Sequence, residues 1–578
     1  MARNVADWIF ANGEILTFHP RIPRAQAVAI TGDRILALGS APEMRRLRGR
    51  ETRWVDLENA TVIPGLVDAH AHMDREGLKF LYPSLESCRS IADIKNLIRR
   101  LASRRRAGEW IVTMPVGAPP FYLDVPDCLQ EKRMPDRHDL DAAAPRHPVY
   151  IRGIWGFWNK PPIYYAANSM ALRLAGITRD TVAPTGVEIV RDAGGEPTGV
   201  FIEHNVTPIL EFTLLKSAPR FTVSDRVRAL KDAQRRYHAR GVTSVYEGHG
   251  VAPELLAAFR ELNASGSLSM RSHLPVSPTW RSRVEAERDI PSLASWAGGD
   301  GIGDGLLRVA GIYLGYGGDA EVSRILTAGL PYTGWAGFAE QAHDRETYRA
   351  LARLARSYGL RVNTIVGGKL DELLEIWEEI DKEAPLRGQR WVLVHLARVT
   401  GRQMPRINRL GALATTNPLS HIYSPRSHRM RDIGDGEEWL PHRELLQQRV
   451  PFGIGTDNKI ADPFLALWSV VAREDFSGSV IGPQQRLTVK QALRQLTAGG
   501  AGVIGRERDL GSLAPGKPAD LVVLSENPMT VPVSALAQIR VRLTMVGGRA
   551  VHRDEPPKGV EVEDGPMRER SQREGRGD

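Results

Sequence analysis

Two histidines, His70 and His72, are the residues of this chain whose types and spacing are best suited to chemistry. One residue separates them, and they follow the mainly apolar run 62–67 and Asp68. Alternate side chains of an extended strand point the same way, so both imidazoles can approach one metal ion from the same side. Such a pair alone is weak evidence, but a buried strand directly before it favours a metal site.

The elements that must position this pair alternate between helices and buried strands. In residues 225–241 apolar side chains recur every three or four positions up to a glycine, and an apolar strand follows at 242–246. The same succession returns at 348–365, and it is typical of a parallel sheet. The predicted barrel strands lie at 62–63, 242–246, 269–274, 307–312, 360–365, 391–395, 412–415 and 452–455. Because eight strands close a (β/α)8 TIM barrel, the predicted fold class is α/β.

The two ends of the chain have a different pattern, with short strands and no helices between them. They predict a small β-sandwich domain built from both ends. About 150 residues separate the first barrel strand from the next helix, too many for one crossover, and these predict an inserted domain or lid. The predicted parts are the sandwich over 1–60 and 505–553, the first barrel strand over 61–75, the insert over 76–222, the metal-dependent barrel over 223–504 and a disordered tail over 554–578.

Composition restricts the class of function. The 578 residues are 42% hydrophobic and 25% charged, and they contain no apolar run long enough to span a bilayer. Asp7 interrupts the place of a secretory signal and two cysteines are too few for a disulfide framework, so a cytoplasmic location is expected. The net charge of +9 is dispersed over helix-like segments, which favours solvated helix faces over a nucleic-acid site. We expect a small-molecule substrate, no nucleic acid and no membrane, and a homodimer is left open.

Motifs along nearly the whole chain, except the tail, resemble one enzyme family. They are Val-Ile-Pro-Gly-Leu-Val-Asp-Ala-His-Ala-His at 62–72, the segments 168–178 and 195–203, Ile-Gly-Thr-Asp at 454–457, and Gly-Ser-Leu-Ala-Pro-Gly-Lys-Pro-Ala-Asp-Leu at 511–521. In this combination they are similar to the type-3 branch of the amidohydrolase superfamily, which includes N-substituted formamide deformylases. The resemblance implies a distorted (β/α)8 barrel beside a small β-sandwich, and hydrolysis of a carbon–nitrogen bond outside ordinary peptides.

The resemblance also implies roles for single residues. His70 and His72 match the ligand pair of the first strand, His395 matches the histidine of the sixth, and Asp457 matches the aspartate of the eighth. Asp457 would contact the metal, accept a proton from the attacking water and pass it to the leaving nitrogen. Asp457 could instead be a turn residue, and His395 could polarise the substrate carbonyl or be structural.

Two positions depart from the family pattern. Tyr313 stands in place of a fourth-strand lysine that can become a carbamate bridging two metals, and residues 363–368, beginning with Asn363, hold no fifth-strand histidine. A bridged pair of metals needs both groups. We therefore expect one zinc ion per chain, with another divalent metal as the alternative, at a corner formed by His70, His72 and Asp457.

Replacement ligands could come from elsewhere in the chain. Glu247 and His249 are again two residues apart and follow the predicted second strand, although two nearby glycines also suit a surface turn. Glu203 ends a family motif, and it could be a ligand or could fix the insert to the barrel.

The insert offers a clue to the substrate. Its aromatic residues crowd one short segment: Trp155, Phe157, Trp158, Tyr164 and Tyr165. They could form the core of the insert, or a wall over the barrel mouth that selects an apolar or aromatic substituent. On the second interpretation Trp155 and Trp158 contact the substrate, together with Tyr313 and Asn363.

The sequence thus predicts a metal-dependent hydrolase of an amide, formamide, carbamate or cyclic amide, with Asp457 and His395 as catalytic residues. Two alternatives are kept open. One is deamination of a heterocycle, and the other is a degenerate barrel that binds a ligand without hydrolysing it.

Overall fold

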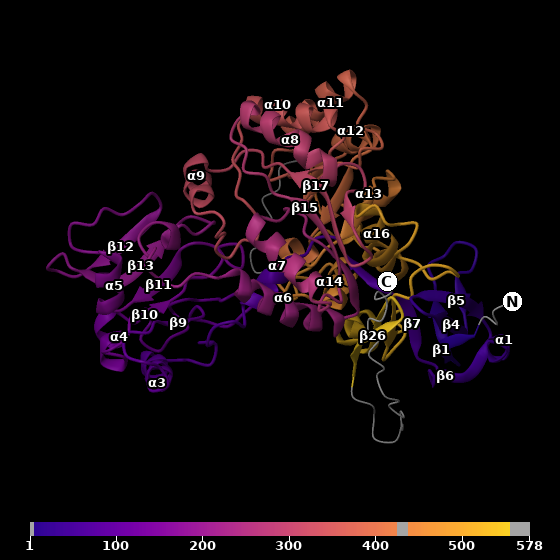
Figure 1. Cartoon of the computed structure of the whole chain (residues 1–578), viewed down its shortest axis with the longest axis horizontal. Coiled ribbons are helices and arrows are strands. Elements are labelled where there is room, and N and C mark those ends of the chain that lie inside the picture. Colours follow the sequence, from indigo (N-terminus) through magenta and orange to yellow (C-terminus); the bar gives the residue numbers. More distant parts are fainter. Residues whose placement is uncertain (1–4, 425–436, 555–578) are drawn as a thin grey trace, which may run out of the picture.

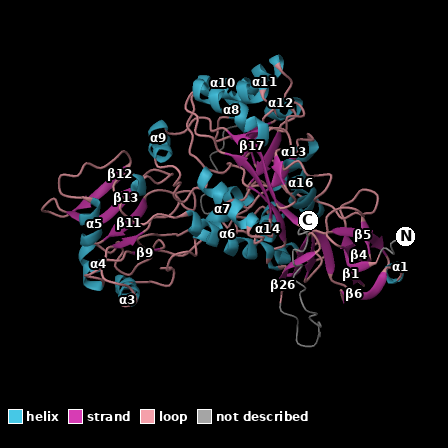
Figure 2. Cartoon of the chain, viewed as in Figure 1, coloured by secondary structure: helices cyan, strands magenta, loops and turns pink. Residues whose placement is uncertain are grey.

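The computed structural model describes residues 5–424 and 437–554. Apart from Asp554, the predicted disordered tail lies outside these residues. Figure 1 shows a central barrel with a β-sheet region on one side, carrying strands β9 to β13, and a second β-rich region on the other side, near the N-terminus. Figure 2 shows helices around the central strands, and helices α3, α4 and α5 beside the strands of the region at the left.

The central strands form the parallel eight-stranded barrel sheet that the sequence predicted. Hydrogen-bonded neighbours run in the order β23, β21, β19, β18, β17, β15, β14 and β8, and a short strand β16 (Ile302–Gly303) pairs with β17 outside this path. In chain order the eight are β8 (Leu66–Asp68), β14 (Val242–Tyr246), β15 (Arg271–Val276), β17 (Leu307–Tyr313), β18 (Val362–Ile365), β19 (Val392–Val394), β21 (Leu413–Thr416) and β23 (Phe452–Ile454).

Helix α10 (Arg345–Ser357) buries one apolar stripe. Its buried residues are Tyr348, Leu351, Ala352 and Ala355, the three- and four-residue spacing that places side chains on one helix face. The other helices of this part are α2 (Met73–Leu78), α6 (Val223–His238), α7 (Pro253–Ala264), α8 (Arg283–Ala297), α9 (Ala320–Ala328), α11 (Leu370–Glu383), α12 (Gln403–Leu410), α13 (His442–Gln447), α14 (Pro463–Ala472), α15 (Val489–Arg494) and α16 (Gly500–Val503). Over the described ranges, no helix combines the length and apolarity needed to cross a membrane.

The first and last barrel strands meet through backbone contacts beyond their ends. The amide of Ala69 donates to the carbonyl of Ile454 at 3.2 Å, and the amide of Asp457 donates to the carbonyl of His70 at 2.8 Å. Asp68 is buried and accepts hydrogen bonds from the amides of His70 and Thr456 and from the Thr456 hydroxyl. The contact that closes the barrel therefore sets His70 directly beside Asp457.

Strands from both chain ends share one sheet. The N-terminal sheet contains β1 (Ala6–Ala11), β4 (Ala27–Thr31), β5 (Arg34–Gly39) and β6 (Arg48–Asp56), with α1 (Ala41–Arg45) beside it. The mixed sheet contains β2 (Glu14–Leu16), β3 (Arg24–Ala25), β7 (Thr61–Pro64), β24 (Leu521–Leu524), β25 (Val541–Val546) and β26 (Arg549–Arg553). Phe10 and Ile30 from the first sheet and Leu521 and Met545 from the second belong to one apolar cluster.

One strand assignment from the sequence was wrong. Residues 62–63, which we predicted to start the barrel, lie in β7, and β7 pairs with β24 and β2 of the mixed sheet. The first barrel strand is instead β8, one residue further along the chain after Gly65. Both segments are apolar and buried, so hydrophobicity alone could not separate them.

Between α2 and α6 the chain forms a separate five-stranded sheet. Its strands are β9 (Ile111–Thr113), β10 (Val149–Ile151), β11 (Ile163–Ala167), β12 (Val187–Arg191) and β13 (Pro197–Glu203), and its helices are α3 (Ile91–Ala102), α4 (Arg137–Ala143) and α5 (Ser169–Ala175). These elements lie within the predicted insert. Trp335 and Phe338, from the segment after α9, pack into the same apolar cluster as Trp155 and Trp158 of the insert.

The close packing of Gly455 against His70, where the first and last barrel strands meet (the barrel seam), predicts that a larger residue at position 455 destabilises the protein. A Cβ atom at this position would lie 2.6–2.7 Å from three atoms of His70, two of them backbone atoms. We expect Gly455→Ala to destabilise the protein by about 1–3 kcal/mol, measured as a lower Tm, because the seam would have to move. Gly502→Ala is the matched control, since no heavy atom lies within 4 Å of its added methyl group; an equal Tm loss in the control would contradict the prediction.

Candidate metal centre

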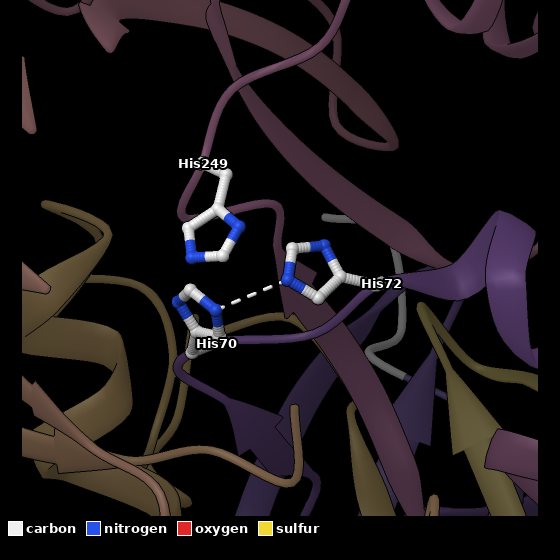
Figure 3. A group of neighbouring side chains, drawn as sticks. All are labelled: His70, His72 and His249. Atoms are coloured by element: carbon white, nitrogen blue, oxygen red, sulfur yellow. Dashed lines mark hydrogen bonds between the residues drawn. The ribbon is translucent and has the colours of Figure 1, made fainter. Parts of the chain in front are cut away.

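Four histidines and one aspartate meet at the carboxyl ends of the barrel strands. His70 and His72 follow β8, His249 follows β14, His395 follows β19 and Asp457 follows β23. Figure 3 shows His70, His72 and His249 with their rings turned toward one another. Parallel strands of a barrel all end at the same rim, so residues more than 380 positions apart become neighbours there.

The ring nitrogens of these residues converge. His70 Nε2 and His72 Nε2 are 3.2 Å apart, and His249 Nε2 and His395 Nε2 are 3.1 Å apart. Asp457 Oδ1 lies 3.6 Å from His72 Nε2 and 4.0 Å from His70 Nε2. Ligand atoms of His70, His72 and His249 all lie within 4.8 Å of one another, and so do those of His70, His395 and Asp457.

The chemistry of this donor set fits a divalent metal ion. Asp457 Oδ1 is buried without a hydrogen-bond partner in the described chain, although a buried carboxylate oxygen normally has one. Burial, and then the charges of neighbouring histidines or of Arg75, lower the pKa values of His70, His72 and His249. These rings are therefore neutral at pH 7 and offer lone pairs, the form that binds Zn²⁺.

The carboxylate of Asp457 has two environments. Oδ2 accepts a hydrogen bond of 2.7 Å from the Ser420 hydroxyl, whereas Oδ1 faces the histidines. Burial alone would raise the pKa of Asp457, but His395, His70 and Lys459 together bring it below its usual range. Asp457 and His395 both have positive φ angles, of 62° and 56°, a conformation that non-glycine residues adopt rarely and mostly at functional sites.

Glu247 contacts the side of the His72 ring that faces away from the other histidines. Its carboxylate lies 3.1 Å from His72 Nδ1 and accepts a hydrogen bond of 2.8 Å from the Met73 amide. A carboxylate beside Nδ1 accepts a hydrogen bond from the Nδ1–H group, which fixes the tautomer whose Nε2 lone pair is free to bind a metal. Glu247, which we predicted as a candidate ligand, is thus placed to orient His72, and its neighbour two residues on, His249, enters the cluster itself.

The two positions that depart from the family pattern have different surroundings. Tyr313 lines the cavity over the cluster, and its ring centroid lies 5.9 Å from that of His249. Asn363 is fully buried and donates hydrogen bonds to the Tyr246 hydroxyl and the Gly248 carbonyl. Asn363 therefore holds the backbone that carries His249 and does not line the cavity, contrary to its predicted substrate contact.

Two further predicted site residues lie in the insert. Glu203 accepts hydrogen bonds from the Tyr165 hydroxyl and the Ile209 amide, so its carboxylate serves the insert and not the metal cluster. Trp158 is fully buried between Tyr122 and Trp335, with ring centroids 5.6 and 4.9 Å away. The prediction that it contacts substrate was wrong, because its ring fills the apolar core of the insert.

A cavity of about 520 Å³ opens over the cluster. Trp155, a predicted substrate contact, lines it, and so do residues that the sequence did not point to: Arg75, Phe338, Glu340, Trp439, Ser420, His421 and Lys459. Burial raises the pKa of Glu340 to about 7, and Arg75 opposes this effect. Arg75 and Lys459 stand close to His72 and Asp457 in the chain and could have been found by that proximity, whereas Phe338 and Glu340 lie in a loop without a motif.

Comparison with known proteins assigns the family. The model described as "Amidohydrolase family" matches residues 53–552. The chain belongs to the amidohydrolase family. The N-substituted formamide deformylase of Arthrobacter pascens is 25% identical over 569 residues, which cover 94% of this chain and 97% of that protein. The amidohydrolase assignment made from the sequence is therefore confirmed.

Solved structures of hydrolases have a similar fold. An uncharacterized metal-dependent hydrolase from Pyrococcus furiosus superposes with a TM-score of 0.66 at 22% identity, covering 90% of this chain and 100% of that one. The atrazine chlorohydrolase TrzN of Arthrobacter aurescens, complexed with zinc, gives a TM-score of 0.50 at 16% identity, covering 96% and 97%. The barrel with an additional domain is thus a shared architecture.

The geometry predicts that His249 contributes to metal retention. We expect His249→Ala to lower the metal affinity by at least about tenfold, because it removes one of the converging nitrogens. Elemental analysis after dialysis against a graded chelator measures this. His552→Ala is the matched control, because His552 lies in β26 of the mixed sheet. Equal metal retention by both variants would contradict the prediction.

Proposed function

We propose that this amidohydrolase uses one divalent metal ion, zinc in the first instance, to cleave a non-peptide carbon–nitrogen bond in a small molecule. The candidate substrates are amides, formamides, carbamates and cyclic amides with an apolar or aromatic substituent. The observation that carries the proposal is the convergence of four histidines and Asp457, of which His249, His395 and Asp457 line a cavity walled by Trp155, Phe338 and Trp439.

The residues that would hold the ion are His70, His72, His249, His395 and Asp457. A second-strand histidine supplies the nitrogen that the fifth strand lacks, which supports a site for one ion. When bound, the ion supplies Lewis acidity, which polarises the scissile carbonyl and makes a water more acidic. The zinc complex of the related atrazine chlorohydrolase is consistent with zinc as the first candidate.

Asp457 is the proton carrier of the proposed reaction. Its low pKa keeps the carboxylate ionised, and the hydrogen bond from Ser420 to Oδ2 fixes its orientation. Asp457 takes a proton from the attacking water and delivers it to the nitrogen as the carbon–nitrogen bond breaks. His395 lies among the ligand nitrogens, so we propose that it is a ligand and not an independent donor to the carbonyl.

Deamination is the second candidate, because short segments of this chain are similar to 5-methylthioadenosine/S-adenosylhomocysteine deaminases, at 30% identity over 131 residues in one case. Release of ammonia from an aminoheterocycle would identify a deaminase, and release of a primary amine from an N-formyl or N-acyl compound would identify an amide hydrolase. A protein that binds metal but hydrolyses neither class would support the degenerate barrel.

The proposed role of Asp457 predicts that a substitution there lowers turnover while most of the metal stays bound. We expect Asp457→Asn to lower kcat by about 10²–10⁴-fold on a panel of N-formyl and N-acyl arylamines, because an amide cannot accept the water proton. At least half of the metal should remain, since four histidines are unchanged. The control is Asp509→Asn, whose side chain lies at the surface beside Arg506. Normal turnover by Asp457→Asn would refute the assigned role.

A further inference from the structure

Arg75 is a buried cation in the wall of the active-site cavity. It lies on α2, three residues after His72, and its exposed fraction is 1%. The cavity over the histidine cluster is lined by Arg75 together with Trp155 and Phe338. A charged guanidinium in such a place requires an explanation, because burying an ion without a partner is costly.

Three other buried arginines of this protein have carboxylate partners, and two more, Arg361 and Arg473, donate hydrogen bonds to backbone carbonyls. Arg226 contacts Asp74 and Glu254, Arg152 contacts Glu211, and Arg271 forms two hydrogen bonds with Asp520. In contrast, the Arg75 side chain makes no hydrogen bond within the described ranges, and its Nε and Nη2 atoms are buried without a partner. The two acids adjacent to Arg75 in sequence are already paired, Asp74 with Arg226 and Glu76 with Lys79.

Aromatic rings fix the guanidinium but do not neutralise it. The Arg75 Cζ atom lies 5.4 Å from the centroid of the Trp155 ring and 5.6 Å from that of Phe338. Such contacts stabilise a cation and restrict its orientation, yet a ring face accepts no conventional hydrogen bond. The side chain is therefore held in place at the cavity wall with hydrogen-bonding capacity left over.

The acids of the cavity do not satisfy Arg75. Asp457 is turned toward the histidines through Oδ1 and toward Ser420 through Oδ2. Glu340 lines the same cavity, but it forms no ion pair with Arg75 within 4.0 Å in the part of the chain that the structure describes. An anionic group that enters with the substrate is the partner that this arrangement lacks.

We propose that Arg75 binds a carboxylate on the substrate, so that the enzyme acts on amides that carry a carboxylate beside an apolar or aromatic group. The inference rests on the proposed amide hydrolysis and narrows its substrate class. Arginine suits this task because its planar fork of donors matches the two oxygens of a carboxylate. The aromatic residues around it would contact the apolar part of the same molecule.

A matched pair of substrates tests the proposal. N-formylphenylalanine, as each enantiomer, and N-formylphenethylamine differ only in the carboxylate. We expect the wild-type enzyme to prefer one enantiomer of the acid over the amine by at least about tenfold in kcat/KM, as a charge-assisted hydrogen bond would produce. Arg75→Gln should bring this ratio close to one, and Arg75→Lys should keep part of it.

The control variant is Arg235→Gln, which removes an exposed cation of α6 that does not line the cavity. It should change the ratio by less than about threefold, because a solvated charge contributes little. Metal content is measured for every variant, since Arg75 lies near the metal-binding histidines. A wild-type ratio near one, or an Arg75→Gln variant that slows both substrates equally, would overturn the proposal.

A failure of the proposed amide hydrolysis can be told apart from a failure of the proposed carboxylate site. If neither compound is hydrolysed, amide hydrolysis is wrong, and the carboxylate site is then judged by binding alone. Calorimetry compares 3-phenylpropanoate with 3-phenylpropanamide in the wild-type protein and in Arg75→Gln. Tighter binding of the acid than of the amide in the wild-type protein, lost in Arg75→Gln, supports the carboxylate site. If Arg75→Gln still binds the acid more tightly to the same extent, as direct binding of the carboxylate to a metal would give, the proposal is overturned.

Discussion

The backbone contact between the first and last barrel strands is the constraint on which the site depends. The Asp457 amide donates to the His70 carbonyl, and Asp68 links both strands through Thr456. Because these hydrogen bonds are direct and buried, they fix the distance between His70 and Asp457, which are 387 residues apart in the chain. Gly455 must be small here, since a methyl group would meet the backbone of His70.

In the proposed metal site, the second strand supplies a histidine where the fifth strand has none. His249 brings its ring nitrogen to 3.1 Å from that of His395, while Glu247 orients His72 and Asn363 holds the intervening backbone at Gly248. Asparagine at position 363 thus acts through the loop that carries His249. This arrangement would let a chain without the fifth-strand histidine surround the single ion that we propose.

The insert and the segment after α9 together form the cavity wall. Trp155 comes from the insert and Phe338 from the segment after α9, yet they belong to one apolar cluster and both contact Arg75. The substrate preference proposed for Arg75 therefore depends on packing between parts that are far apart in sequence. Trp158, only three residues from Trp155, is enclosed in the same cluster and takes no part in the cavity.

The sequence by itself predicted the barrel and the amidohydrolase family, because strand periodicity and motif spacing are local properties, and the family resemblance pointed to His70, His72, His395 and Asp457 as site residues. It also proposed His249 without deciding between a ligand and a turn. The tertiary structure brought His249 beside His70 and His72, and it placed residues 62–63 in the mixed sheet, Glu203 in the insert, and Arg75, Phe338 and Glu340 in the cavity wall. These placements follow from which strands pair and which loops pack together, and such long-range contacts leave no periodic signal in a single chain.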